Sequence, residues 1–252
     1  MIYLKTDEEI ELMRVSNLLV GKTLGELSKW IAPGITTLKL DKIAEEFIRD
    51  NGGVPGFLGY GGFPATLCVS VNETVVHGIP SSQTLREGDI VSIDTGAAIN
   101  GFNGDNACTF PCGKVDIEAQ RLMDVTKESL HRGIAAAVAG NRVGDIGHAV
   151  QSYVEENGFS VVRSFVGHGV GKELHEDPEV PNYGHAGHGV RLVNGMTIAI
   201  EPMVNQKHHS VKTLSDGWTV VTADGGLAAH FEHSIAILPG GPEILTIGWE
   251  EP

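Results

Sequence analysis

The sequence is poor in cysteine, in basic residues and in long apolar runs. Its three cysteines, Cys68, Cys108 and Cys112, are too few for a disulfide framework and too irregularly spaced for a zinc motif, so we expect them to be reduced. Only 18 Lys and Arg oppose 32 Asp and Glu, and the formal net charge of -14 repels phosphate backbones and anionic lipid surfaces. Nucleic acid is therefore not expected as a partner.

Signals for export or membrane insertion are also lacking. Acidic residues interrupt the first 14 positions, where a secretory signal needs an apolar run, and no later segment offers the roughly 18 apolar residues of a membrane span. We expect a cytoplasmic protein with no membrane contact.

Apolar periodicity predicts the same order of elements twice. Thr6 and Glu9 form a capping box before a long amphipathic helix, and a second helix over about 37–50 stops at Asn51-Gly52-Gly53. Strand-like segments follow, and a second helix pair is expected through residues 122–139 and 143–156. The expected strands cover about 66–76, 89–110, 159–166, 197–204, 211–214, 219–223 and 229–238.

This order indicates an internal duplication. Gly88 stands six residues before Asp94, and Gly195 stands six residues before Glu201, each ahead of an alternating apolar strand. We expect one domain, 1–252, made of pseudo-symmetric halves at about 1–113 and 114–252. A pseudo-two-fold axis would bring Asp94 and Glu201 to corresponding places, with a site between the halves.

A hairpin aims two acids at one place. Asn100-Gly101 predicts a two-residue turn, and pairing outward from it sets Ile99 against Phe102 and Gly96 against Asp105. Asp94 then lies diagonally beside Asp105 on the same face. A buried carboxylate costs several kcal/mol unless it is paired or metal-bound. One such Asp would more often face solvent, but two on one face favour a metal site.

Three further ligand-type residues follow downstream. His168 stands between glycines after an apolar segment, while Glu201 and Glu232 stand within strand-like surroundings. The similar Gly187-His188-Gly189 run is interpreted as a loop. Four carboxylates and one neutral imidazole carry a charge of about -4, which two divalent cations would balance. Oxygen-rich ligation with one His suits Mn, Fe, Co or Zn, without selecting among them.

These residues and their surroundings resemble the type I methionine aminopeptidases of family M24, which have the creatinase-like pita-bread fold. The resemblance covers about residues 4–247. The motifs that carry it are Ser70 to Pro80, Ser92-Ile93-Asp94, Gly104-Asp105, Gly167 to Gly171, Leu174 to Pro178, Ile200 to Met203, Asp216 to Thr219 and Phe231-Glu232-His233. It implies an α+β fold with two ααββ halves around a curved antiparallel sheet, and a short segment from His168 to Glu201 favours type I.

The resemblance also implies a ligand set and a reaction. Asp94 would chelate one metal, Asp105 and Glu232 would bridge the pair, and His168 and Glu201 would complete the other. A metal-bridging hydroxide would attack the scissile carbonyl of an N-terminal methionine that precedes a small residue. Glu201 would shuttle the proton to the leaving amine.

Two histidines and an apolar pocket complete the implied site. His175 would bind the carbonyl oxygen of the substrate, and His77 would contact the peptide beyond the scissile bond. The methionine side chain would enter a pocket lined by Tyr60, Phe63, Cys68, Leu174 and Trp218. Without the resemblance, each of these residues would be taken as part of the core.

Four positions depart from the family pattern. Gly61 and Asn103 stand where His is common, Leu174 where Phe is common, and His230 where Gln is common. None is an implied ligand, so the departures bear on pocket shape and on the surroundings of the metals.

The implied partner is the N-terminal methionine of nascent polypeptides. We expect a monomer, with any transient ribosome contact made by the folded surface. The alternatives are a proline-directed peptidase of the same fold, a non-catalytic relative, and an α+β protein with structural calcium, against which the imidazole of His168 argues.

Overall fold

The computed structural model describes residues 1–249, so the last three residues of the expected domain, 250–252, lie outside the described part. Four α-helices form two pairs: α1 (Asp7–Ser28) with α2 (Thr37–Asp50), and α3 (Ile117–Ala136) with α4 (Val143–Glu156). A short 3-10 helix, η1, covers Tyr60–Gly62. All four predicted helices are confirmed, and the third ends at Ala136 rather than at 139.

Local chemistry explains where the helices begin. The Thr6 side chain accepts the N–H of Glu9 and the Glu9 carboxylate accepts the N–H of Thr6, which is the expected capping box. Asp116 caps α3 in the same way through the N–H of Ala119. Burial of the apolar stripe of α1, including Met13 and Leu24, holds this helix against the strands.

Fifteen strands are present within residues 1–249. They are β1 (Val54–Pro55), β2 (Leu67–Val71), β3 (Thr74–Val76), β4 (Ile90–Ile99), β5 (Phe102–Pro111), β6 (Ser160–Val161), β7 (Gly167–Gly169), β8 (Glu176–Val180), β9 (Thr197–Ile200), β10 (Met203–Asn205), β11 (Val211–Thr213), β12 (Val220–Thr222), β13 (Ala228–His230), β14 (His233–Leu238) and β15 (Gly241–Ile244).

Four of these strands, β1, β7, β8 and β15, were not predicted. The predicted strand 159–166 was wrong in its extent, because pairing stops soon after β6. Arg163 and Ser164 follow it and are exposed, so this part of the chain cannot continue along the core.

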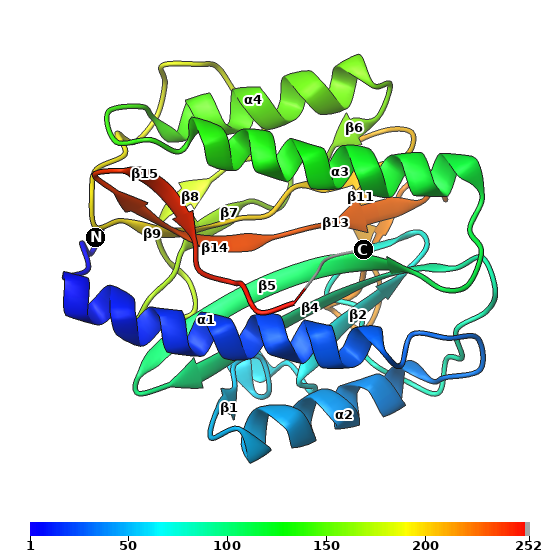
Figure 1. Cartoon of the computed structure of the whole chain (residues 1–252). Helices are drawn as coiled ribbons and strands as arrows, with labels where there is room; N and C mark the ends of the chain where they lie inside the picture. The colour runs from blue at the N-terminus through cyan, green and yellow to red at the C-terminus, as the bar shows by residue number, and fades with distance from the viewer. Residues whose placement is uncertain (250–252) are drawn as a thin grey trace.

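The expected antiparallel pairing is confirmed for every strand pair, and the strands divide among four hydrogen-bonded sheets. The largest follows the order β15-β14-β9-β7-β8, and the β4-β5 hairpin joins β1 and β2 in another. Figure 1 shows α1 with α2 below the strands and α3 with α4 above them. None of the helices within residues 1–249 combines the length and apolar character that crossing a membrane requires.

The two halves repeat a local hydrogen-bond pattern. The N–H of Gly88 donates to Cys112, whose N–H donates back to Asp89, at 2.9 and 2.8 Å. In the second half, the N–H of Gly195 donates to the carbonyl of Ile237, and the N–H of Ile237 donates to the carbonyl of Met196, each at 2.9 Å. Both glycines have positive φ, +91° and +87°, which a residue with Cβ rarely adopts. The short sequence match therefore marks corresponding strand starts in the pseudo-symmetric pita-bread fold.

Candidate active site

The β4-β5 hairpin brings Asp94 and Asp105 to one cavity. Its observed register pairs Ile99 with Phe102 and Gly96 with Asp105, as predicted from the Asn100-Gly101 turn. Asp105 is 3 % exposed and lines the cavity together with Asp94. The two acids therefore point to the same place from adjacent strands.

Glu201 and Glu232 stand at breaks between strands of the second half. Glu201 follows β9 and precedes Pro202, which has no N–H to donate to a sheet, and Glu232 lies between β13 and β14. Because β9 pairs with β14 and β10 with β13, the two breaks lie opposite each other. The N–H of Glu232 donates to the carbonyl of Ala107 on β5 at 2.9 Å, which joins this part of the chain to the hairpin.

His168 lies within the short strand β7 rather than after a strand. A Cβ at Gly167 would meet the Ala199 carbonyl oxygen at 2.3 Å, so the neighbouring strand demands glycine there. The Nδ1 of His168 lies 2.8 Å from the Gly169 carbonyl oxygen. Because that carbonyl can only accept, Nδ1 carries the hydrogen, and the lone pair of Nε2 faces the carboxylates.

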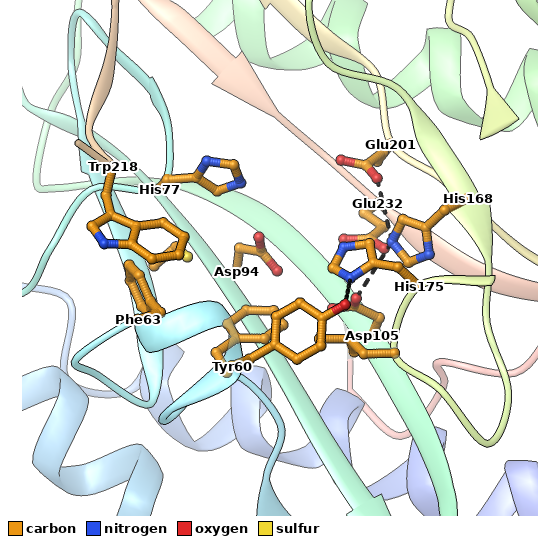
Figure 2. Close-up of a pocket in the computed structure, with 13 residues that line it drawn as sticks. Tyr60, Phe63, His77, Asp94, Asp105, His168, His175, Glu201, Trp218 and Glu232 are labelled. Carbon is orange, nitrogen blue, oxygen red and sulfur yellow. Dashed lines mark hydrogen bonds and ion pairs between the residues drawn. The ribbon is translucent and has the colours of Figure 1, made fainter. Parts of the chain in front are cut away.

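The five predicted ligand residues meet in this cavity (Figure 2). The Nε2 of His168 lies 3.7 Å from Asp105 Oδ2 and 3.6 Å from Glu201 Oε1. One ligand atom each from Asp105, His168 and Glu232 all lie within 4.8 Å of one another. These separations exceed direct hydrogen bonds and leave room for a cation about 2.0–2.2 Å from each donor.

Unpartnered carboxylate oxygens support a cation at this place. Within residues 1–249, Asp94 Oδ1, Asp105 Oδ1 and Glu232 Oε1 are buried and have no hydrogen-bond partner. A buried, unpartnered carboxylate oxygen costs free energy that a bound cation would recover. The donor set of oxygen atoms and one imidazole nitrogen therefore fits divalent metal.

Burial also sets the protonation of the metal-free site. Desolvation raises the pKa of Asp94 to about 7 and that of Glu201 to about 8. Desolvation, and then the neighbouring acids, raise the pKa values of Asp105 and Glu232 well above their usual range. Desolvation lowers the pKa of His168 to about 3, so its imidazole is neutral near pH 7, the form that binds metal.

The whole cavity has a volume of about 260 Å³, and apolar side chains line the part of it away from the carboxylates. Figure 2 shows Trp218 and Phe63 at one end, with Asp94 between them and the group formed by Asp105, His168 and Glu232. The Trp218 and Phe63 rings meet edge to face with centroids 5.2 Å apart. All twelve predicted site residues line this cavity: Tyr60, Phe63, Cys68, His77, Asp94, Asp105, His168, Leu174, His175, Glu201, Trp218 and Glu232.

The thirteenth lining residue, Phe57, was not predicted. It stands in an irregular segment before η1, where no periodicity indicates which way a side chain points. A Cβ at Gly96 would meet the Phe57 ring at 2.8 Å, so this ring packs on bare backbone of β4. A glycine in a strand is a weak signal of such an approach, and it does not identify the partner.

His175 and His77 lie on different sides of the cavity. The Nδ1 of His175 is 2.8 Å from the Tyr60 hydroxyl, and its ring centroid is 4.2 Å from that of His168. His77 has φ +58°, a strained backbone for a residue with Cβ, and its ring contacts Phe165. Desolvation lowers the pKa of both histidines, that of His77 to about 4, so both are neutral near pH 7.

The four departures from the family pattern lie around this site. A Cβ at Gly61 would lie 3.5 Å from the Trp218 ring, and Leu174 is buried in the pocket. The Asn103 amide donates to the carbonyls of Gly171 and Lys172, at 3.1 and 2.9 Å, and so holds the loop that carries His175. His230 is buried with its Nε2 3.5 Å from Glu201 Oε2.

Sequence comparisons agree with this geometry. The model of metallopeptidase family M24 matches residues 11–239. A methionine aminopeptidase from Clostridium acetobutylicum is 56 % identical over 248 residues, covering 98 % of this chain and 99 % of the relative. Methionine aminopeptidase 1 from Bacillus subtilis is 54 % identical over 246 residues, with the same coverage.

Solved structures show the same relationship in three dimensions. A methionine aminopeptidase from Thermotoga maritima superposes with a TM-score of 0.96 and 48 % identity over 98 % of this chain and 99 % of that one. An Xaa-Pro dipeptidase from Bacillus anthracis shares the fold with a TM-score of 0.79 at 21 % identity, over 98 % of this chain and 63 % of its own. The chain therefore belongs to metallopeptidase family M24 and, within it, to the type I methionine aminopeptidases.

Proposed function

We propose that the chain removes the N-terminal methionine from newly made proteins whose second residue is small. The observation that carries this proposal is the meeting of five ligand-type side chains with an apolar pocket in one cavity. A metal centre in a cavity that also has an apolar part suits hydrolysis of the bond after an apolar first residue. The relatives named methionine aminopeptidase support the same activity.

The ligands are proposed to be Asp94, Asp105, His168, Glu201 and Glu232, holding two divalent ions of Mn, Fe, Co or Zn. Asp105 and Glu232 are buried deepest of these and come from different halves, so they would hold metal where the halves meet. Bound divalent cations would supply Lewis acidity, which polarises a carbonyl and lowers the pKa of water. The remaining steps depend on side chains of the protein.

Glu201 is proposed to move the proton. Its Oε1 faces His168, while its backbone carbonyl accepts the amide of Asn182 at 3.0 Å, which fixes the strand break that carries it. A carboxylate in this place can take a proton from the attacking water and give it to the leaving amine.

His175 is proposed to donate to the carbonyl oxygen of the scissile bond. Tyr60 holds its Nδ1, which leaves Nε2 for the substrate. A neutral imidazole that donates a hydrogen bond stabilises the oxyanion as negative charge develops, which typically contributes roughly 3–4 kcal/mol. His77, on the Trp218 side of the cavity, is proposed to contact the peptide beyond the scissile bond.

Selectivity for methionine is proposed to come from Tyr60, Phe63, Cys68, Leu174 and Trp218. Aromatic edges and a buried thiol suit the flexible, polarisable thioether. One methylene in an apolar pocket changes binding by about 1–3 kcal/mol, so related aliphatic side chains should be cleaved at least about tenfold more slowly.

The experiment is a peptide panel with defined metals. Chelated protein, reloaded in turn with Mn, Co, Fe or Zn, is assayed on Met-Ala, Met-Gly, Met-Leu, Leu-Ala and Xaa-Pro peptides. We expect cleavage of Met-Ala and Met-Gly only after metal is restored. Full activity of the metal-free protein would refute the metal mechanism, and preferred cleavage of Xaa-Pro would assign a proline-directed peptidase instead.

The cellular setting follows from the same proposal. The substrate would be the methionine end of nascent chains, encountered in the cytoplasm by a monomer. The ribosome would be met, transiently, through the folded surface. Centrifugation of the purified protein alone tests whether it is a monomer, and centrifugation with ribosomes tests the transient contact.

A further inference from the structure

Glu201 stands between two imidazoles, one for each carboxylate oxygen. Its Oε1 lies 3.6 Å from His168 Nε2, and its Oε2 lies 3.5 Å from His230 Nε2. His168 belongs to the expected ligand set, but the mechanism above gives His230 no role. The side chain of His230 is only 1 % exposed, so a structural reason for a polar ring at this place is required.

One ring nitrogen of His230, Nε2, is unpartnered. Across residues 1–249, Nε2 of His230 has no hydrogen-bond partner and is shielded from solvent. This nitrogen lies 3.5 Å from Glu201 Oε2. His230 does not line the cavity itself, although it lies 3.5 Å from Glu201, which does.

The backbone of His230 fixes this approach. Its N–H donates to Thr109 Oγ1 at 2.9 Å, and the Thr109 hydroxyl donates to its carbonyl at 2.8 Å. His230 on β13 is also paired with Met203 on β10, and Met203 stands two residues after Glu201. These bonds fix the backbone of His230, and burial of the side chain leaves its ring little room to turn away from Glu201.

We propose that His230 is a positioning residue for Glu201, whose Oε2 accepts the Nε2 hydrogen of the neutral His230 ring. The present 3.5 Å separation is about half an ångström longer than a usual N–H···O bond, and a small rotation of the carboxylate closes it. With Oε2 held in this way, Oε1 is presented to the cation beside His168. This inference rests on the proposed function only where it calls Glu201 the proton shuttle.

The commonest alternative role of such a ring is that of another metal ligand. The group of potential ligands around Asp105, His168 and Glu232 does not include His230 within the described chain. His230 also does not line the cavity in which the five ligand-type residues meet. A hydrogen bond from a neighbouring residue commonly orients a metal ligand and so tunes the affinity of the site for metal.

The test compares His230→Gln with His230→Met. The two replacements have similar length, but only Gln carries an N–H donor, so the pair separates hydrogen bonding from packing. Metal affinity is measured on the chelated protein by Mn titration calorimetry, and kcat and KM are measured on a Met-Ala peptide at saturating Mn. Thermal unfolding of both variants establishes that they fold.

We expect His230→Met to lose about ten- to hundredfold in kcat and in Mn affinity with KM nearly unchanged, and His230→Gln to stay within about threefold of the parent protein. Equal behaviour of His230→Met and the parent, or equal losses in both variants, would overturn the proposal. A Co-substituted spectrum that shows one nitrogen ligand fewer in His230→Gln would overturn it too, by making His230 a ligand.

These outcomes are distinct from failure of the proposed function. Should the parent protein leave every methionine peptide intact, the proposed function fails, whereas Mn affinity of the variants still decides the role of His230. Should the parent protein cleave Met-Ala while His230→Met keeps parental kcat and affinity, only the role of His230 falls.

Discussion

His168 and Asp105 face each other across the two halves of the chain, with Nε2 of the imidazole 3.7 Å from Oδ2 of the carboxylate. Asp105 comes from the β4-β5 hairpin of the first half, and His168 comes from β7 in the second. Neither half contains the centre by itself. The chemistry therefore depends on how the halves pack, and changes at their contact should affect metal binding as well as stability.

Replacing Glu201 by Gln should remove most turnover. The amide cannot carry a proton between water and the leaving amine, so we expect kcat at saturating Mn to fall by about 10²- to 10⁴-fold, with KM changed little. Steady-state kinetics on a Met-Ala peptide, with Mn content measured on the same sample, checks this. The exposed Glu128→Gln on α3 serves as the control. A near-parental rate in Glu201→Gln would exclude the shuttle role.

The free energy of unfolding of the chelated protein, from which a chelator has removed the metal, should fall as pH rises. Burial raises the folded-state pKa of Asp94 from 3.8 to about 7 and that of Glu201 from 4.5 to about 8. Between the ordinary and the raised values the folded chain binds more protons than the unfolded chain, so the free energy of unfolding decreases with increasing pH. Thermal unfolding of chelated protein should give a lower Tm near pH 8 than near pH 5.

Metal should reverse this trend, because a cation replaces the protons on the carboxylates. Adding Mn near pH 8 is expected to raise Tm more than adding it near pH 5. Asp94→Asn, which cannot ionise, should show a shallower pH dependence when chelated. A chelated Tm that rises from pH 5 to pH 8 in the parent but not in Asp94→Asn would contradict the assignment of buried, protonated acids.

Tyr60→Phe should affect the chemical step more than binding. The change deletes only the hydroxyl that holds His175 Nδ1 at 2.8 Å. An imidazole free to turn presents its other nitrogen to the substrate less often, so we expect kcat to drop by about three- to thirtyfold while selectivity for methionine persists. Kinetics on Met-Ala and Leu-Ala peptides measures both effects, with the exposed Tyr3→Phe as control. A changed Met-to-Leu ratio with intact kcat would assign Tyr60 to the pocket alone.

Lys5→Met should destabilise the protein strongly. Lys5 and Glu176 form an ion pair whose side chains are each 5 % exposed, and Glu176 follows His175 directly. Removing one partner leaves a buried charge, which typically costs about 3–5 kcal/mol, whereas replacing both by apolar residues is often neutral. Urea unfolding of Lys5→Met and of Lys5→Met with Glu176→Leu measures this. A double variant no more stable than the single one would show that packing, rather than the unpaired charge, is responsible.

Short-range rules account for much of the fold. The Thr6 capping box, the Asn100-Gly101 turn and the register of Gly96 with Asp105 all follow from neighbours within a few residues, and all three are observed. The repeated glycine before each acid-bearing strand also has the same positive φ in both halves. Such features are local because a cap, a two-residue turn or a glycine conformation is decided by nearby backbone groups.

The amino-acid sequence by itself determined the helices, the hairpin and, through the family's motifs, which twelve side chains to expect together. Only the tertiary structure decided that Phe57 joins their pocket and that His230 lies beside Glu201. The strand breaks at Glu201-Pro202 and Phe231-Glu232 lie opposite each other and bring His230 close to Glu201, whereas Phe57 packs on Gly96 of β4. Periodicity reports which side of a strand is buried, but the partner of a buried ring depends on how whole strands pack.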